Sequence, residues 1–390
     1  MSKNKKSSKK GNNSGGGDDD ELKRDQKLQA ILLADTFRGS FNPITWDMPT
    51  VLLPLLNIPM LEYTIEFLAQ NDVEEIFIFC CWDAEKIEEY VNSSQWSSLV
   101  SVRCITSSNC LSAGDALREL DALGEVRSDP FILISGDVVA NLDLKRAIKV
   151  HKENCKDSAC VMTVCMKKMA HEGCKVRSVR DDLIVGMDRN TSQVVLFNDN
   201  IQKSSVALPV EIMVDHPGVQ LHTDLLDCHV DICSPALLLQ FSDNFDYQDI
   251  RKHFIQNEAI NWELGMHIYG HVLQNHEYAA RVSDPRTYHH VCMDIINRWV
   301  HPIVPEYQFG GSLGLKTASD FIQQKSNVYR EKGIKVSRTA ILSDSVVIGK
   351  DCVVGDRVCI AKSIIGHKCC IMRDTSITNA HLWGGTEQLY

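Results

Sequence analysis

Residues 32–55 read Leu-Leu-Ala-Asp-Thr-Phe-Arg-Gly-Ser-Phe-Asn-Pro-Ile-Thr-Trp-Asp-Met-Pro-Thr-Val-Leu-Leu-Pro-Leu, and this stretch decides the fold. It begins at the end of an apolar run, residues 28–33, which is short and hydrophobic enough for a strand buried in a parallel sheet. A mostly polar loop follows the run. Another apolar run, residues 131–135, ends at Gly136-Asp137, where a doubly wound sheet is expected to place its ligand crevice.

The framework of the stretch resembles the signature of the sugar-nucleotide pyrophosphorylases, A-G-G-x-G-T-R-L-x-P-L-T followed by P-K-P-L-L-P. The residues that keep its register are Ala34, Pro43, Thr45, Pro49, Leu52, Leu53 and Pro54. The residues that would carry chemistry are replaced. Asp35, Thr36 and Arg38 occupy the positions of the three glycines. Ser40 occupies the position of the arginine, and Thr50 that of the lysine.

These replacements remove the chemistry of a phosphate-binding loop. Glycines allow backbone N–H groups to press against a phosphate, whereas three side chains, one of them an acid, obstruct and repel a polyphosphate. The lysine and arginine of the signature would stabilise charge that develops during nucleotidyl transfer, and threonine and serine supply no such charge. The scaffold is therefore predicted to be retained while catalysis is lost.

A second position supports the same prediction. Asp137 follows an apolar run and matches the family's metal-binding aspartate, although an aspartate in a strand-end turn is the interpretation that we favour. The other metal aspartate of the family begins the motif D-I-G-T-P-x-D-Y. In the matching stretch Pro285 and Tyr288 keep register, but Arg281 stands in place of that aspartate. A cation at this position would repel Mg²⁺.

Composition limits the classes of protein. The chain has 390 residues, of which 44% are hydrophobic, so a large core and two or three domains are expected. A net charge of −10 argues against a nucleic-acid-binding face, and no apolar run is long enough for a membrane span. The lysine-rich N-terminus has no apolar segment of a secretory signal, which favours a cytosolic protein.

Cysteine and histidine residues give no strong signal of a site. The 15 cysteines contain no C-x-x-C pair, and this spacing argues against zinc. The evenly spaced Cys155, Cys160 and Cys165 are interpreted as buried, reduced thiols. His229 and the pair His289-His290 are interpreted as structural. No catalytic residue, metal or cofactor is therefore predicted.

The chain divides into three parts. Residues 1–27 contain almost nothing apolar and are predicted to be a disordered tail. Residues 28–325 are predicted to form a nucleotidyltransferase-like α/β domain with a doubly wound, mostly parallel sheet, because apolar strand-like runs alternate with helical patterns. The predicted strands cover 28–33, 75–81, 102–106 and 131–135, and the predicted helices cover 60–71, 83–92 and 113–123.

An antiparallel insertion is predicted where the pattern changes after residue 158. Its β-rich stretches are 159–165, 183–188 and 193–198, and a further apolar stretch follows at 225–234.

The third part, residues 326–390, repeats with a period of six. Aliphatic or aromatic residues recur at Leu342, Ile348, Val354, Ile360, Ile365, Ile371, Ile377 and Trp383, with one five-residue step before Ile365. Glycine follows three of them. This pattern is typical of a left-handed parallel β-helix, here a short one of about two and a half coils. Because the sequence after residue 383 leaves the pattern, we expect a truncated β-helix.

A degenerate nucleotidyltransferase-like domain followed by hexapeptide repeats resembles the gamma and epsilon subunits of eukaryotic translation initiation factor 2B. Details over about residues 28–384 are similar to epsilon. The segments that carry this resemblance are Asp35 with 41–44, 51–55, 77–82, 227–235 and 244–248.

The resemblance implies a cytoplasmic subunit of the guanine-nucleotide exchange factor for initiation factor 2, and not an enzyme in its own right. The implied partners are the gamma subunit, the other regulatory subunits and initiation factor 2, with no direct contact to nucleic acid or membrane. The family's exchange-catalysing helical domain is expected to be absent from this chain. The family's contact with the substrate factor would be made by Asn244, Phe245 and Asp246.

Two alternatives stay open. The first is an active sugar-1-phosphate nucleotidyltransferase similar to mannose-1-phosphate guanylyltransferases, against which Thr50 and Arg281 argue. The second is a pseudoenzyme whose crevice still binds a nucleotide or sugar nucleotide, for which Asp137 at a strand end leaves room.

Overall fold

The computed structural model describes residues 27–35, 40–157, 159–169, 183–199, 210–261, 263, 265–307, 309–310 and 321–384. The predicted disordered tail lies outside the described residues except for Lys27. Thr36 and Arg38 of the predicted loop also lie outside them, as do residues 385–390 at the end of the predicted β-helix.

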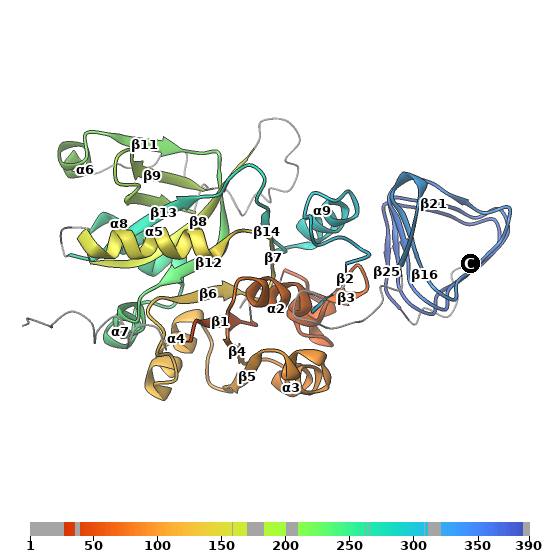
Figure 1. Ribbon diagram of the computed structural model, residues 1–390, viewed down its shortest axis with the longest axis horizontal. Coiled ribbons are helices and arrows are strands. Elements are labelled where there is room, and N and C mark those ends of the chain that lie inside the picture. The colour runs from red at the N-terminus through yellow and green to blue at the C-terminus, as the bar shows by residue number, and fades with distance from the viewer. Residues whose placement is uncertain are drawn as a thin grey trace, which may run out of the picture.

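A seven-stranded sheet forms the centre of the larger domain, in the order β13-β8-β12-β6-β1-β4-β5 (Figure 1). Its strands are β1 (Gln29–Leu33), β4 (Glu75–Cys80), β5 (Ser101–Thr106), β6 (Phe131–Ser135), β8 (Cys160–Lys168), β12 (Leu225–Cys233) and β13 (His267–Val272). The strands β6, β1, β4 and β5 run parallel, β12 is antiparallel to both neighbours, and β13 is parallel to β8. The mostly parallel sheet is thus confirmed.

Helices cover both faces of this sheet. They are α2 (Met60–Gln70), α3 (Ala84–Ser93), α4 (Ala113–Leu123), α5 (Leu144–Asp157), α7 (Ala236–Asp243), α8 (Gln256–Ile260) and α9 (Pro285–Ile296). Along β1, Ala30 and Leu32 belong to one buried cluster and Ile31 and Leu33 to another. Because successive side chains of a strand point to opposite faces, β1 is buried on both sides, as a doubly wound sheet requires.

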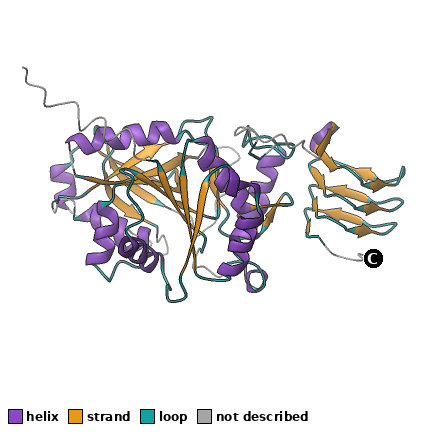
Figure 2. Cartoon of the chain, turned by 60° about the horizontal axis from the view of Figure 1, so that its bottom comes forward, coloured by secondary structure: helices purple, strands orange, loops and turns teal. Residues whose placement is uncertain are grey.

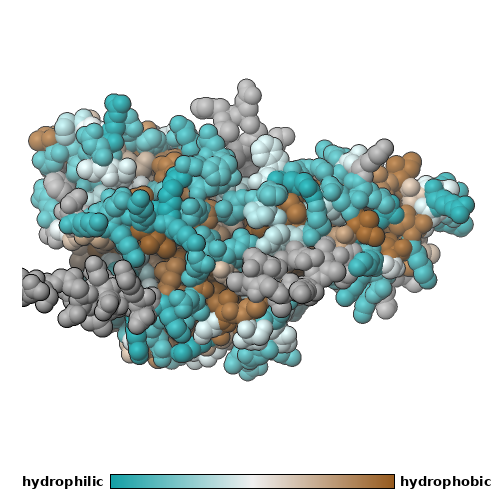
Figure 3. All heavy atoms as spheres, in the orientation of Figure 1, coloured by the Kyte–Doolittle hydropathy of each residue, from teal (hydrophilic) through white to brown (hydrophobic). Residues whose placement is uncertain are grey.

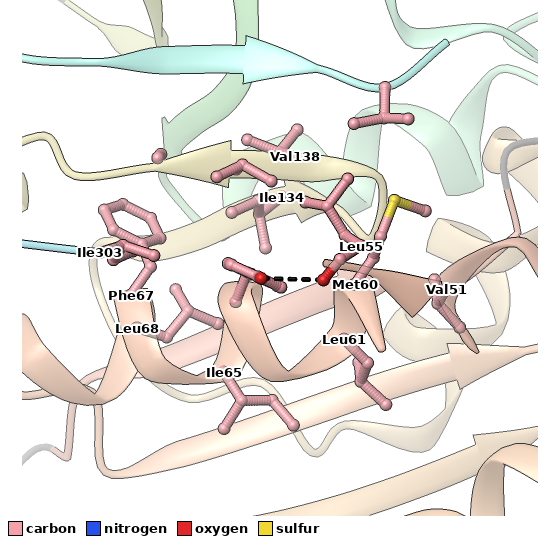
Figure 4. Close-up of a cluster of buried hydrophobic side chains, with 14 of the residues drawn as sticks. Val51, Leu55, Met60, Leu61, Ile65, Phe67, Leu68, Ile134, Val138 and Ile303 are labelled. Atoms are coloured by element: carbon pink, nitrogen blue, oxygen red, sulfur yellow. Dashed lines mark hydrogen bonds between the residues drawn. The ribbon is translucent and has the colours of Figure 1, made fainter. Parts of the chain in front are cut away.

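The first cluster packs α2 against the sheet (Figure 4). Ile65, Phe67 and Leu68 of the helix lie with Ile134 of β6 and Val138 in that picture. The Thr64 hydroxyl, buried in the same place, donates to the Val138 carbonyl at 3.1 Å and so satisfies its polar group.

The predicted strands and helices of residues 28–135 are confirmed to within two residues at each end. One prediction beyond them is wrong. Residues 159–165 were assigned to the antiparallel insertion, but β8 belongs to the main sheet between β12 and β13. Its seven consecutive buried residues, Cys160–Met166, form the continuous apolar run of a strand covered on both faces.

The separate antiparallel sheet consists of β10 (Val194–Asn198), β9 (Ile184–Asp188) and β11 (Val219–His222), beside the short helix α6 (Val210–Asp215). A two-stranded pair, β7 (Val138–Ala140) with β14 (Ala279–Arg281), lies at the edge of the crevice and sets Arg281 opposite Val138. The loop after β1 contains short 3₁₀ helices at Ile44–Trp46 and Thr50–Leu52 and the small hairpin β2 (Pro54–Leu55) with β3 (Ile58–Pro59).

The C-terminal part is a parallel β-helix whose strands stack in layers (Figure 2). One wall contains β15 (Phe321–Gln324), β16 (Val328–Glu331), β19 (Val346–Ile348), β22 (Ile364–Ile365) and β25 (His381–Leu382). The second wall contains β17 (Lys335–Val336), β20 (Val353–Val354) and β23 (Cys370–Ile371), and the third β18 (Ile341–Leu342), β21 (Cys359–Ala361) and β24 (Ser376–Thr378). The predicted six-residue repeat is thus confirmed as one wall per hexapeptide. The predicted domain boundary near residue 325 stays a prediction.

The five-residue step shortens a coil without breaking the stack. Val328 pairs with Val346, eighteen residues later, whereas Val347 pairs with Ile364, seventeen residues later. Coils approach closely at Gly366, where an added Cβ would lie 2.3 Å from the backbone nitrogen of Gly384. The shorter coil also corrects one detail of the predicted series: Leu382 packs against the β-helix core, and Trp383 packs against the core of the larger domain.

One wall of the β-helix faces the larger domain. Tyr329, Val347 and Ile364 are register partners on adjacent strands, and all three belong to the same buried cluster as α2 and α9. The Tyr329 hydroxyl donates to the Ile296 carbonyl at 3.2 Å at the end of α9. The Asn57 amide also donates to the Ile365 carbonyl at 3.1 Å. The two parts therefore share one apolar core and are not joined by a free linker.

Other surfaces of the β-helix remain apolar and open. Figure 3 shows hydrophobic residues gathered over the β-helix on the visible face. Ile322, Ile341, Val353 and Met372 are exposed in this part of the chain. Among the described residues, no helix combines the length and apolar character that crossing a bilayer requires.

A pair of histidines at the domain interface predicts acid sensitivity. The His289 and His381 rings meet through Nδ1 and Nε2 at 2.8 Å. Burial, with the nearby His289, lowers the pKa of His381 to about 4. Burial likewise lowers the pKa of His289, with His290 adding to the effect. Between pH 6.5 and 4 the unfolded chain then binds more protons than the folded one, so stability should fall as the pH falls through this window.

The measurement is urea denaturation at several pH values between 7 and 4. His381→Gln should flatten the decline of the unfolding free energy, because the neutral amide has no proton to gain. The exposed His301→Gln is the matched control and should keep the decline of the parent protein. An unchanged slope in His381→Gln would contradict the assignment.

Candidate functional site

A cavity of about 310 Å³ lies at the carboxyl ends of β1 and β6, where the parallel sheet was predicted to place its crevice. Asp35 and Ser135 line it from the strand ends. Ser112 and Ala113, at the start of α4, line a second side, and residues 248–253 and Arg281 close it. With His229 and Asp231 of β12, the cavity brings together segments from six separate parts of the chain.

Asp137 and Arg281 form a buried ion pair at the edge of this cavity. The Arg281 Nε lies 2.8 Å from Oδ2 and 3.0 Å from Oδ1 of Asp137, and the two residues are 8% and 1% exposed. The Ser135 hydroxyl donates to Asp137 Oδ1 at 2.7 Å. Arg281 Nη1 also contacts His229 Nε2 at 3.0 Å. The pairing of β7 with β14 places the two charges together, 144 residues apart in sequence.

This ion pair changes what the strand end can bind. A carboxylate that holds a divalent cation needs its negative charge free to face the metal. Here the guanidinium neutralises Asp137 and occupies its oxygens from the side of β14. The predicted turn around Asp137 is present, but its carboxylate has a specific partner that the sequence did not reveal.

A second buried network lies beside the first and was missed from the sequence. Arg251 donates to Asp227 through Nε at 2.7 Å, and to Asp231 through Nη1 at 2.6 Å and Nη2 at 3.0 Å. Burial acts to raise the pKa of Asp227, but the Arg251 charge outweighs it and holds that pKa below its usual range. The only signal in the sequence was the presence of two acids, at residues 227 and 231, in one otherwise largely apolar segment.

The described residues that depart from the pyrophosphorylase signature, Asp35, Ser40 and Thr50, differ in their surroundings. The Asp35 carboxylate accepts from the backbone N–H of Cys81 at 2.5 Å and of Trp82 at 3.1 Å, which ties the end of β1 to the end of β4. Burial raises the pKa of Asp35, and these hydrogen bonds oppose the rise. Ser40 and Thr50 are half-buried, and Thr50 begins the second 3₁₀ helix. The structure brings only Asp35, of these three, to the cavity wall.

The predicted interaction residues Asn244, Phe245 and Asp246 lie in the turn after α7. Asn244 ends the helix, and its side-chain oxygen accepts from the backbone N–H of Asp246 at 3.1 Å. Phe245 between them is 74% exposed. The chain then continues directly into residues 248–253 of the cavity wall. The turn therefore directly precedes residues that line the crevice, but it does not include the Asp137–Arg281 ion pair.

Two residues of α4 hold this turn, and both were missed from the sequence. Arg118 Nη1 donates to the carbonyls of Phe241 and Tyr247, each at 3.1 Å. Its guanidinium also lies 5.4 Å from the centre of the Phe245 ring, in a cation–π arrangement. One helical turn earlier, Gly114 lies so close to the turn that an added Cβ would come within 2.0 Å of the Tyr247 carbonyl oxygen.

The base of the turn is anchored in the core. The rings of Tyr247, Phe241 and Phe254 pack against one another with centroid distances of 5.3 to 5.8 Å. The Tyr247 hydroxyl donates to Glu258 Oε1 at 2.6 Å. An exposed aromatic ring on a turn held in this way loses little conformational freedom when it binds a partner.

Removal of the buried cation predicts a large loss of stability. Arg281→Met leaves Asp137 as a buried carboxylate without its ion-pair partner, which should lower the unfolding free energy by about 3–5 kcal/mol in urea denaturation. The exposed ion pair of Arg357 with Asp374 is the matched control, and Arg357→Met should change the stability little.

A double variant separates the charge from the packing. In Asp137→Asn with Arg281→Met, neither member of this pair carries a charge, so much of the lost stability should return. A double variant as unstable as the sum of both single variants would show that the ion pair is not the cause.

Comparisons with known proteins agree with this architecture. A family model described as nucleotidyl transferase matches residues 30–173. The translation initiation factor eIF2B subunit epsilon of Dictyostelium discoideum is 44% identical over 332 residues, which cover 84% of this chain and 46% of that protein. The subunit of the same name in Schizosaccharomyces pombe is 38% identical over 333 residues, or 84% of this chain and 48% of that protein.

A more distant relative is an enzyme by name. The mannose-1-phosphate guanylyltransferase 1 of Arabidopsis thaliana is 20% identical over 358 residues, which cover 90% of this chain and 82% of that protein. The chain spans about half the length of the two eIF2B subunits. It contains a nucleotidyl transferase domain, and by its sequence over 84% of its length it is a homologue of the epsilon subunits of eIF2B.

Proposed function

We propose that this protein acts as an epsilon subunit of the guanine-nucleotide exchange factor eIF2B in the cytosol. In this role the nucleotidyltransferase fold is a scaffold, and the protein contributes to assembly and to contact with initiation factor 2. The observation that carries the proposal is the similarity to two epsilon subunits over 84% of the chain. The geometry of the crevice and of the turn at Phe245 adds independent support.

The crevice supports a scaffold because its buried arginines are already paired with carboxylates. Arg281 stands against the carboxylate that an active relative would use for Mg²⁺, so a metal ion would have to displace a buried cation. Asp35 faces the cavity with a carboxylate where the signature has glycine. Nucleotidyl transfer needs positive charge near the phosphates, and an acid at that place opposes it.

The turn at Phe245 supports a contact with initiation factor 2. Large aromatic side chains are frequent anchors of protein interfaces, and they contribute most when the free protein already holds them in position. Arg118 and Gly114 supply that support from α4, while the ring itself stays 74% exposed. The acid at Asp246 beside the ring favours a partner surface with positive charge.

Assembly with the gamma subunit would use the outer walls of the β-helix and the larger domain. Ile341, Val353 and Met372 expose apolar side chains on separate strands or turns of the β-helix. Exposed apolar side chains on a β-helix offer contact area that another subunit can cover. The other regulatory subunits of the exchange factor are included in the proposal as partners of the complete assembly.

A binding experiment tests the contact with initiation factor 2. Phe245→Ala should weaken binding of the factor by about 1–3 kcal/mol, because truncation removes an interface anchor. Arg118→Met should also weaken binding, since the turn loses its two carbonyl contacts while Phe245 is retained. Calorimetry or surface plasmon resonance with purified factor gives the dissociation constants.

The matched controls are an equally exposed aromatic residue and an exposed arginine. Trp299 is 73% exposed, and Trp299→Ala should bind the factor as the parent protein does. Arg103→Met removes an exposed ion pair with Glu125 and should also bind normally. Normal binding by Phe245→Ala would remove the turn from the interface.

A reconstitution experiment tests the scaffold role. The recombinant chain mixed with the gamma subunit at micromolar concentration should elute from size exclusion as one complex. The same sample, incubated with Mg²⁺, nucleoside triphosphates and common sugar 1-phosphates, should release no pyrophosphate. Separate elution would overturn the assembly role, and sugar-dependent pyrophosphate release would favour an active nucleotidyltransferase instead.

A further inference from the structure

Three potential metal ligands meet on the side of α5, and none of them lines the cavity described above. His151 and Cys155 lie one turn apart on the helix, and Cys160 begins β8 after the chain reverses direction. One ligand atom from each residue lies within 4.8 Å of the other two. The sequence predicts Cys155 and Cys160 to be buried thiols, and the structure confirms this for Cys160 but leaves Cys155 exposed.

The distances suit a tetrahedral site. Cys155 Sγ lies 3.4 Å from His151 Nε2, and Cys160 Sγ lies 3.5 Å from His151 Nδ1. With zinc–sulfur bonds of about 2.3 Å and zinc–nitrogen bonds of about 2.0 Å, the sulfur–nitrogen edge of a tetrahedron is roughly 3.5 Å. Only one ring nitrogen of His151 can bind the metal, so one of these two sulfur–nitrogen separations matches that edge directly, and the other sulfur has to move toward the same nitrogen from within 4.8 Å.

The second nitrogen of the imidazole has a partner suited to a supporting role. His151 Nδ1 lies 2.9 Å from the Thr163 hydroxyl oxygen. When Nδ1 carries the proton and donates to Thr163, Nε2 presents its lone pair toward Cys155. Metal-binding histidines use their other ring nitrogen in this way, which fixes the tautomer and the ring orientation.

Metal binding at this cluster requires both thiols to lose their protons. A bound cation stabilises the thiolates and releases their protons, as zinc does in other thiolate sites.

We propose that His151, Cys155 and Cys160 form a binding site for a soft divalent metal ion of the zinc type, with a fourth position on the exposed side of Cys155. Two thiolates and one imidazole match the ligand preference of Zn²⁺ and discriminate against Mg²⁺ and Ca²⁺, which prefer oxygen. The absence of a C-x-x-C pair does not matter here, because the turn between helix and strand brings the ligands together. The site would fasten the end of α5 to the start of β8.

Cobalt titration of the full chain tests the site, with the thiols kept reduced by a phosphine. One equivalent of Co²⁺ should produce sulfur-to-cobalt charge-transfer absorption and the visible bands of tetrahedral cobalt. Zn²⁺ should then displace the cobalt and remove the bands. Zn²⁺ should also slow alkylation of the exposed Cys155.

Single variants assign the ligands. Cys155→Ser changes an exposed side chain, so the variant should fold normally and bind Co²⁺ roughly tenfold or more weakly. His151→Gln and Cys160→Ser should also weaken binding. Cys359→Ser removes a different exposed thiol and is the matched control, which should retain the parent spectrum. Absence of charge-transfer bands in the parent protein, or bands that persist in Cys155→Ser, would overturn the proposal.

Discussion

The structure depends on the burial of one short strand on both of its faces. Ile31 and Leu33 point into one core while Ala30 and Leu32 point into the other, so β1 joins the two helical layers that cover the sheet. Its parallel hydrogen bonds to β4 and β6 set the level at which all three strands end. Asp35 and Ser135 consequently meet at one cavity, whose position depends on that alignment.

At this crevice, buried carboxylates are paired with arginine side chains. Asp137 faces Arg281, and Arg251 faces Asp227 and Asp231. A buried ion pair contributes less to stability than its short distances suggest, because both charges lose their water. The Asp137–Arg281 pair has a stronger effect on metal binding, because a metal ion at this place would meet a carboxylate whose charge the arginine already balances. These ion pairs support the scaffold role proposed above for the nucleotidyltransferase fold.

The β-helix and the larger domain behave as one packed unit. Tyr329, Val347 and Ile364 turn an outer wall of the β-helix into part of the core around α2 and α9. A binding surface that spans both parts is then presented at a fixed geometry, which lowers the entropy lost when another subunit docks. The turn at Phe245 follows α7 beside the other buried cluster, to which Phe241 and Tyr247 belong, so the proposed assembly and factor contacts would use separate surfaces.

The sequence by itself determined the classes of the elements and their order. Apolar runs of strand length, helical periodicity and the six-residue repeat are local patterns. They arise because burial of a segment on one or two faces determines which of its neighbouring residues are apolar. The family resemblance likewise rests on contiguous segments, such as 227–235.

Only the tertiary structure decided which charged residues meet. Arg281 reaches Asp137 across 144 residues, and Arg118 reaches the Tyr247 carbonyl across 129. Residues 159–165, which the sequence assigns to the insertion, lie in the main sheet, and Cys160 lies beside His151. Contacts of this kind depend on strand order and chain reversal, which no local pattern records, because the same residues at the same spacing would stay apart in another topology.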